Sequence, residues 1–213
     1  MRLNNKVLTY INNYPILGYL LERLLLKYDR NKIIIATSNQ QTDDKILQYC
    51  IRQRFRCYRG DLENVSKRLL AAAQFEGAEA FIRINGDSPL IDPKIIVQGI
   101  EFFNSGRYDL VTNTSPRSFP VGQSVEVIRT NTFEKAYKRM SLPGHFEHVT
   151  LYYYDNPNEF RIGNFTHKRD LSNYRLVVDT QEDLDRMEKI IGSMTRPHTE
   201  YGLDELIKLY PAV

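Results

Sequence analysis

Hydrophobic positions recur along this chain with two different spacings, and polar stretches separate them. Continuous runs of β-branched and other apolar residues, such as Lys32–Thr37, predict strands buried on both faces. Leucines and isoleucines that return to one side every three or four residues predict helices, the first of them starting at Pro15. The predicted strands are 32–37, 54–58, 81–85, 108–113, 123–128, 160–165 and 174–178, and the predicted helices are 15–25, 43–49, 62–75, 93–103, 132–139, 146–155, 181–191 and 203–209.

Strands and helices alternate along most of the sequence, which is typical of an α/β domain with a mostly parallel sheet. The stretch 115–172 is less regular, and we expect it to form a small side lobe on a single domain that spans 1–213. A length of 213 residues with 42% hydrophobic content is enough to bury one substantial core.

Charge and composition restrict the possible partners. The net charge of +3 is too small to indicate nucleic-acid binding, although a locally positive pocket for an anionic substrate fits it. The longest apolar stretch, Tyr19–Leu26, contains Glu22 and Arg23, so no membrane span is predicted, and no signal peptide is visible. Cys50 and Cys57 are too few for a disulfide framework and are expected to be buried apolar residues. The cytoplasm is the expected location.

Two predicted strands end in a carboxylate. Asp87 follows the apolar strand at the start of Phe81–Ile91, at the position where a parallel sheet binds ligands. Asp179 ends a second apolar strand, Tyr174–Val178, directly before a helix. Two carboxylates at one sheet edge would provide the oxygen ligands that Mg²⁺ prefers. The alternative is structural, with Asp87 capping a turn and Asp179 or Thr180 capping the helix.

Taken together, Asn85–Ile91 and Val178–Leu184 resemble motifs of the nucleotidyltransferases that activate acidic sugars with CTP. These are the CMP-KDO and CMP-N-acylneuraminate synthetases and, above all, the SpsF-like spore-coat polysaccharide biosynthesis proteins. The resemblance runs over essentially the whole chain, and the ordered series of matches is more specific than any single motif. The further matches are Arg2–Leu8, Ala36-Thr37, Asp43-Asp44, Arg59-Gly60, Val65, Arg68, Gly122, Val125–Val127 and Glu147–Thr150.

The resemblance implies a three-layer, Rossmann-like nucleotide-diphospho-sugar transferase fold and a cytidylyltransferase activity. In this reaction a sugar oxygen attacks the α-phosphate of CTP and pyrophosphate leaves, so positioning and charge neutralisation supply most of the rate. By the same resemblance, Asp87 and Asp179 hold Mg²⁺ and Lys6 binds the triphosphate, the three forming the catalytic set. A solvated terminus is the alternative for Lys6 and Arg2. The nucleotide-binding candidates are Arg2, Lys6, Arg68, Asn85 and Gly86.

Four residues of the side lobe are candidates for binding the sugar. His148 and Tyr152 resemble the sugar-binding segment of the KDO enzymes, and their spacing would place both on one face of a helix. A partly buried structural role is the alternative for His148. Gln123 and Glu126 are expected to share a strand face that looks toward the sugar.

The start of the sequence departs from the family pattern. The family opens with a central strand and a glycine-containing loop, whereas this sequence starts where that loop would end and has Asn4-Asn5 in place of Pro-Gly. The strand would lie between 33–37 and 81–85, so its loss would leave two unpaired edges roughly 10 Å apart. A late start, a sheet that closes up, or a degenerate homologue would each explain this. We therefore expect weak or absent activity for this polypeptide.

The leading interpretation is thus a CTP-dependent enzyme of surface-polysaccharide biosynthesis, with Mg²⁺ as cofactor and a small acidic sugar as partner substrate. A glycosyltransferase of a related fold is one alternative, since it would also use Asp87 as a metal ligand. A non-catalytic homologue that serves assembly or regulation is the other. Family members commonly pair through the side lobe, so a homodimer is expected.

Overall fold

A computed structural model describes residues 6–211. The strands are β1 (Tyr10–Ile11), β2 (Tyr14–Pro15), β3 (Ile34–Ser38), β4 (Arg56–Gly60), β5 (Ala80–Arg83), β6 (Leu110–Thr112), β7 (Glu126–Arg129) and β8 (Ile162–Asn164). The α-helices are α1 (Ile16–Leu25), α2 (Asp44–Arg52), α3 (Val65–Phe75), α4 (Pro93–Asn104), α5 (Thr130–Tyr137), α6 (Pro143–Glu147), α7 (Leu151–Asp155), α8 (Gln181–Gly192) and α9 (Leu203–Lys208). Short 3₁₀ helices are η1 (Lys6–Leu8), η2 (Arg30–Lys32), η3 (Gln41–Asp43) and η4 (His198–Glu200).

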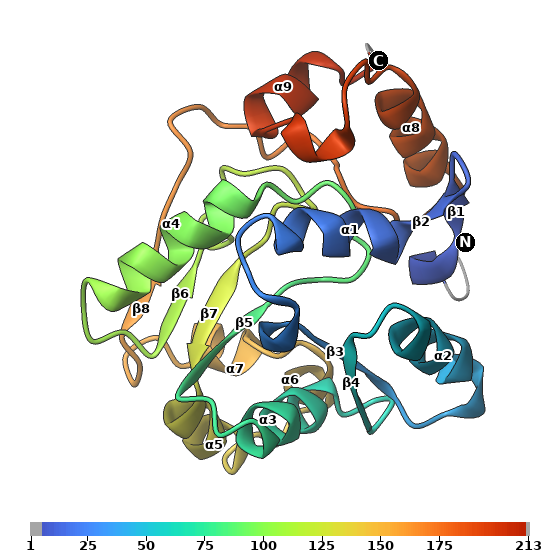
Figure 1. Ribbon diagram of the computed structural model, residues 1–213. Helices are drawn as coiled ribbons and strands as arrows, with labels where there is room; N and C mark the ends of the chain where they lie inside the picture. The colour runs from blue at the N-terminus through green and yellow to red at the C-terminus, as the bar shows by residue number, and fades with distance from the viewer. Residues whose placement is uncertain (1–5, 212–213) are drawn as a thin grey trace.

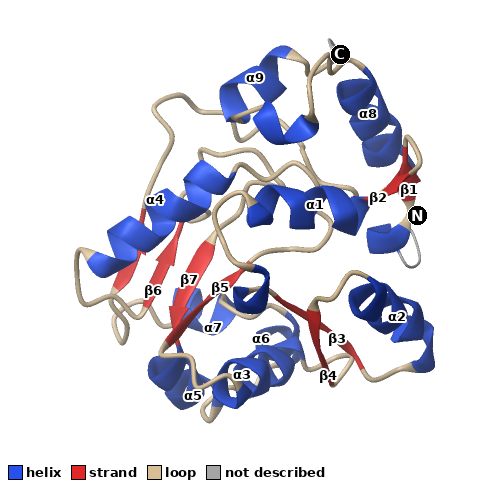
Figure 2. Ribbon diagram, in the orientation of Figure 1, coloured by secondary structure: helices blue, strands red, loops and turns tan. Residues whose placement is uncertain are grey.

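The strands form a mixed α/β arrangement (Figures 1 and 2). The largest sheet has four strands in the order β5-β7-β6-β8, and β7 runs antiparallel to both of its neighbours. Because β6 and β8 pair in parallel, β5, β6 and β8 all point the same way. A second, two-stranded sheet pairs β3 with β4 in parallel, and a small hairpin pairs β1 with β2. The predicted α/β class is confirmed, with β7 as the strand of opposite direction.

Alternating side chains of the four-stranded sheet face two separate layers of helices. Val111 and Val127 belong to the main core together with residues of α1, α4 and α8. Their strand neighbours Leu110 and Ile128 point to the other face, into a second cluster built mainly from α5 and α7. The sheet is thus the middle layer of three (Figure 1). Most side-lobe aromatics lie inside these cores, Phe119 and Tyr153 among them, where they cannot form a contact with another subunit.

Buried Arg23 links the first long helix to a distant part of the chain. Its Nε donates to Ile91 O at 2.7 Å and its Nη2 to Tyr201 O at 2.7 Å, and Nη1 donates to His198 O. The side chain is 1% exposed, and burial lowers the pKa of its guanidinium to about 10. The helix α1 is therefore fixed to the segment that precedes α9.

Two predicted elements differ in the structure. The helix expected at 146–155 is split into α6 and α7, because the consecutive side chains of Val149 and Thr150 are both buried and Thr150 Oγ1 donates to Glu126. The strand expected at 174–178 is extended but has no continuous strand partner among residues 6–211. Leu176 N instead donates to Val121 O at 2.7 Å, next to Gly122 with φ +96°.

The gap expected where the family places its first strand is present. Within residues 6–211, β3 pairs only with β4 and β5 pairs only with β7, so the sheet does not close up across the gap. Of the three explanations raised by the sequence, closure of the sheet is wrong. No helix within the described part of the chain is long and apolar enough to cross a bilayer.

Candidate active site

The structure brings the two strand-end aspartates together. Val178 N donates to Asp87 O at 2.9 Å, so the segment that precedes Asp179 runs directly alongside the turn that carries Asp87. That turn is closed by Ser88 N, which donates to Asn85 O at 3.3 Å. The two carboxylates thus converge from segments far apart in the sequence.

Lys6 lies between the two carboxylates. Its Nζ donates to Asp87 Oδ2 at 2.6 Å and also to Asp179 Oδ1. Partial burial acts to lower the pKa of Lys6, but the hydrogen bonds and negative charges of Asp179 and Asp87 outweigh it and raise the pKa above its ordinary value. A positive charge is therefore held where the two carboxylates meet.

The donor set fits a hard divalent cation that keeps most of its other ligands from solvent or substrate. The carboxylates of Asp87 and Asp179 are 16% and 36% exposed, so both are partly accessible to solvent. Within residues 6–211 no group of three or more His, Cys, Asp or Glu side chains is placed to hold a metal. Mg²⁺ is commonly bound by one or two carboxylates together with phosphate oxygens and water. Two carboxylates without a full protein cage match that pattern.

Asp183 fixes the backbone on which Asp179 stands. Its Oδ2 accepts from the backbone N–H groups of Asp179 and Thr180, both at 3.2 Å, and the Thr180 side chain caps α8 in return. Thr180 is therefore the helix cap, and the carboxylate of Asp179 stays available for a ligand. Burial acts to raise the pKa of Asp183, but Arg175 and the other donors hold that pKa far below its usual range.

The sequence reasoning did not assign a role to Arg175. Its Nε and Nη2 each donate to one oxygen of Asp183 at 3.1 Å, and Nη2 lies 3.7 Å from Asp179 Oδ2. Arg175 stands four residues before Asp179 in the same motif. In an extended segment, however, that spacing alone does not indicate contact.

The other nucleotide candidates lie in different surroundings. Gly86 lies against η1, since a Cβ there would be in van der Waals contact with Val7 Cγ1 at 3.4 Å. Arg68 donates from Nη1 to Asp61 O at 2.6 Å, and burial lowers the pKa of its guanidinium. Arg68 therefore stabilises the loop that follows β4. Arg2 falls outside the described residues.

The four sugar candidates do not share a face. Gln123 precedes β7 and is fully buried, where its side chain accepts from Asp92 N and donates to Leu90 O, so its predicted orientation is wrong. Positions three apart also point to opposite sides of a strand. Tyr152 lies in a core at 6% exposure, whereas His148 is exposed between α6 and α7. The prediction that these two share a helical face is therefore wrong as well.

Glu126 is buried but has charged and polar neighbours. It accepts from Arg83 Nη1 at 2.5 Å and from Thr150 Oγ1 at 2.6 Å, and Arg83 pairs with it across β5 and β7. Arg83 is four residues from Asp87, so this ion pair stands at the same end of the sheet as the two aspartates. A cross-strand partner of this kind was not visible in the sequence, because the pairing of β7 with β5 is long-range.

These residues lie in a chain whose relatives can be identified. A family model described as Cytidylyltransferase matches residues 1–208. The chain belongs to the cytidylyltransferase family. This cytidylyltransferase is 30% identical to the spore coat polysaccharide biosynthesis protein SpsF of Bacillus subtilis. The match extends over 217 residues and covers 98% of this chain and 88% of SpsF. The predicted family is therefore confirmed.

Solved structures support the same assignment. A cytidylyltransferase from Leptospira borgpetersenii serovar Hardjo-bovis is 29% identical with a TM-score of 0.91, over 98% of this chain and 88% of that one. A CMP:2-keto-3-deoxy-manno-octonic acid synthetase solved with CTP shares the fold, with a TM-score of 0.67 at 17% identity over 90% of this chain and 93% of that one. The nucleotide-diphospho-sugar transferase fold and the nucleotidyltransferase class are thus confirmed.

Proposed function

We propose that this cytidylyltransferase transfers the cytidylyl group of CTP to a hydroxyl of a small acidic sugar and releases pyrophosphate. The observation that carries the proposal is the convergence of Asp87, Asp179 and Lys6 at one edge of the fold. Two carboxylates that can bind a metal ion and a lysine ammonium that can bind phosphate oxygens are suited to holding a metal-bound triphosphate. The family assignment supplies the reaction class.

In the proposed reaction, the sugar oxygen forms a bond to the α-phosphorus while the bond from that phosphorus to the bridging oxygen of pyrophosphate breaks. The hydroxyl proton passes to solvent. Asp87 and Asp179 would bind Mg²⁺, which neutralises phosphate charge when it is present. Lys6 would then direct its ammonium to the triphosphate oxygens and stabilise the charge of the leaving pyrophosphate. Asp183 and Arg175 keep Asp179 in position throughout.

The acidic sugar and its pathway rest on weaker support. The resemblance to CMP-sugar synthetases and the likeness to SpsF favour a sugar of surface polysaccharide biosynthesis. Of the four predicted sugar candidates, Glu126 and His148 are kept, and Arg83 is added because it forms an ion pair with Glu126 four residues before Asp87. Pairing of two chains through 115–172 and a cytoplasmic location stay predictions, and light scattering on the purified protein would measure the first.

The first experiment measures binding and turnover separately. Calorimetric titration with CTP and Mg²⁺ tests the site, and pyrophosphate release with a panel of acidic sugars tests the reaction. D87N and D179N should abolish the CTP heat, whereas D185N should not, because the Asp185 side chain is exposed on α8 and, among residues 6–211, accepts a hydrogen bond only from Gln181. A CTP affinity unchanged in D87N and D179N would refute the proposed site. Release of a free nucleotide from a nucleotide-sugar donor, without pyrophosphate, would indicate a glycosyltransferase instead.

A further inference from the structure

The two cysteines of this chain lie on neighbouring elements and have no part in the proposed reaction. Cys50 is in the last turn of α2 and Cys57 is on β4, and both are free thiols. Cys50 is fully buried in the main core, whereas Cys57 packs against that core and is only half-buried. The expected burial is thus confirmed for Cys50 and holds only in part for Cys57.

The chain reverses sharply after α2, and the reversal brings β4 back along the helix. Arg54 has a φ of +58°. Phe55 N donates to Cys50 O at 2.8 Å, and Arg54 N donates to Ile51 O at 3.1 Å. Two such hydrogen bonds around a left-handed residue form a Schellman motif, in which the next residue commonly packs on the last helical turn. Phe55 is accordingly buried in the same core as Cys50.

Alternate residues of β4 face α2. Successive side chains of a strand point to opposite faces, so Phe55, Cys57 and Arg59 share one face. At the far end of this face, Arg59 Nη1 lies 2.7 Å from Oδ1 of Asp44, the first residue of α2. The face of β4 that carries Cys57 is therefore connected to α2 both before and after the cysteine.

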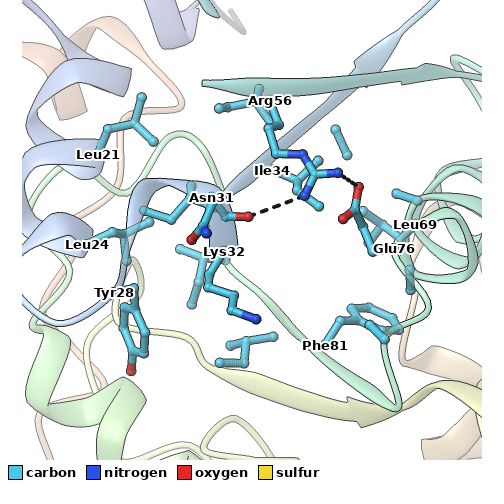
Figure 3. Close-up of a pocket in the computed structure, with 18 of the residues that line it drawn as sticks. Leu21, Leu24, Tyr28, Asn31, Lys32, Ile34, Arg56, Leu69, Glu76 and Phe81 are labelled. Carbon is cyan, nitrogen blue, oxygen red and sulfur yellow. Dashed lines mark hydrogen bonds and ion pairs between the residues drawn. The ribbon is translucent and has the colours of Figure 1, made fainter. Parts of the chain in front are cut away.

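The other face of β4 is fixed by contacts on the opposite side. Arg56, the neighbour of Cys57, forms an ion pair with Glu76 directly after α3. Its Nη1 also donates to Asn31 O at 3.3 Å (Figure 3). Because Arg56 points away from α2, the next side chain along the strand points toward it. Cys57 is thus held against the helix that carries the second thiol.

The two thiols interact directly. The S–H group of Cys50 donates to Cys57 Sγ, and this hydrogen bond lowers the pKa of Cys57, which Arg59 lowers further against the effects of burial and of Asp43. The same hydrogen bond and burial raise the pKa of Cys50. A thiolate is the form of cysteine that attacks a disulfide. Cys57 is therefore the thiol that reacts first, and Cys50 stands beside it as a second thiol.

We propose that Cys50 and Cys57 are a reversible oxidation site that reacts with small disulfides such as oxidised glutathione. The Cys57 thiolate attacks one sulfur of the small disulfide, whose sulfur–sulfur bond breaks, and the released thiolate takes up a proton. Cys50 then loses its proton and attacks Cys57 in the mixed disulfide, which forms the Cys50–Cys57 bond and releases the second small thiol. The protein loses two hydrogen atoms, and the small disulfide is reduced to two thiols.

The bond would join α2 to β4 between two contacts that already connect them. Cys50 and Cys57 are seven positions apart, so the cross-link encloses a short segment and restricts the unfolded chain only moderately. Oxidation should therefore raise Tm by about 2–5 °C, and a reductant should reverse the rise.

The test incubates the folded full chain with oxidised glutathione and follows the mass of the protein. The parent protein should lose two hydrogen atoms and retain no glutathione, and peptide mapping should join the peptides of Cys50 and Cys57. C50A should stop with one glutathione on Cys57, because no second thiol can displace it. C57A should stay unmodified, because its remaining thiol is fully buried.

Several results would overturn the proposal. A parent protein that keeps both thiols, retains glutathione as a stable mixed disulfide, or forms a disulfide between two chains lacks the proposed site. A fall in Tm on oxidation would overturn it too, because the native positions would then have to distort in order to close the bond. Mapping of the parent protein decides the matter even if C50A does not fold. None of these measurements depends on cytidylyl transfer.

Discussion

Replacing Asp183 with asparagine should weaken both the fold and the proposed metal site. The Asp183 side chain is 3% exposed and accepts hydrogen bonds from Arg175, from Arg186 Nη1 at 2.7 Å, and from the backbone of Asp179 and Thr180. In D183N one carboxylate oxygen becomes an amide that can only donate. The new amide NH₂ group then points at N–H donors and can accept no hydrogen bond from them. The negative charge that pairs with the guanidinium groups of Arg175 and Arg186 is also lost.

The loss of unfolding free energy in D183N depends on how deeply Arg175 and Arg186, the ion-pair partners of Asp183, are buried. Removing one partner of a fully buried ion pair costs about 3–5 kcal/mol of unfolding free energy. Arg175 is 41% exposed and Arg186 is 16% exposed, so water compensates part of the loss. We expect D183N to lower the unfolding free energy by about 2–3 kcal/mol and Tm by about 5–10 °C. The matched variant D185N should change Tm by less than about 2 °C.

The loss of stability in D183N should depend on pH, which a loss of packing alone would not do. The pKa of Asp183 is lowered in the folded state, so its stabilisation is present above the unfolded pKa of about 3.9 and is lost as pH falls toward the folded value. The Tm gap between the parent protein and D183N should stay constant from pH 8 to about pH 5 and narrow below about pH 4. A gap that does not change with pH, or a CTP affinity equal to that of D185N, would refute this account of Asp183.

Three further substitutions test other contacts. In K6M the two aspartates lose the ammonium between them, so Mn²⁺ should bind the free protein more tightly in calorimetry, while pyrophosphate release should fall by about 100-fold; weaker Mn²⁺ binding would contradict the site. In R23M three backbone carbonyls lose a buried donor, and urea unfolding should show a loss of about 3 kcal/mol, with R23K restoring only part of it. In G122A the new Cβ would lie 2.2 Å from Leu176 O at a φ of +96°, so Tm should fall by about 5 °C or more.

Long, strongly periodic elements could be predicted from the sequence. The helices α1, α3, α4 and α8 lie close to their expected bounds, because each carries a continuous apolar stripe and a turn or cap at its start. Helix capping was less clear, since both Asp179 and Thr180 suited the start of α8. The structure assigns the cap to Thr180 and frees Asp179, a distinction that depends on the position of Asp183.

The parts that could not be predicted depend on contacts between distant residues. The pairing of β7 with β5 sets Glu126 against Arg83, and the backbone pattern of β7 alone does not indicate this partner. The burial of Gln123 depends on two backbone groups of the segment that precedes α4, about thirty positions earlier. By contrast, the meeting of Asp87 and Asp179 was predicted from a general rule about strand ends, although the segment before Asp179 forms only an isolated bridge through Arg175.

The contacts of Arg23 also bear on how this protein is made. The carbonyls of His198 and Tyr201 follow the arginine by 175 and 178 positions, so in a nascent chain only the carbonyl of Ile91, among these three partners, is available to Arg23 for most of synthesis. Amino-terminal segments usually begin to fold first during synthesis. Here the early segment cannot complete its final packing until His198 and Tyr201 have been synthesised, so the last contacts of α1 form only when nearly the whole domain is available.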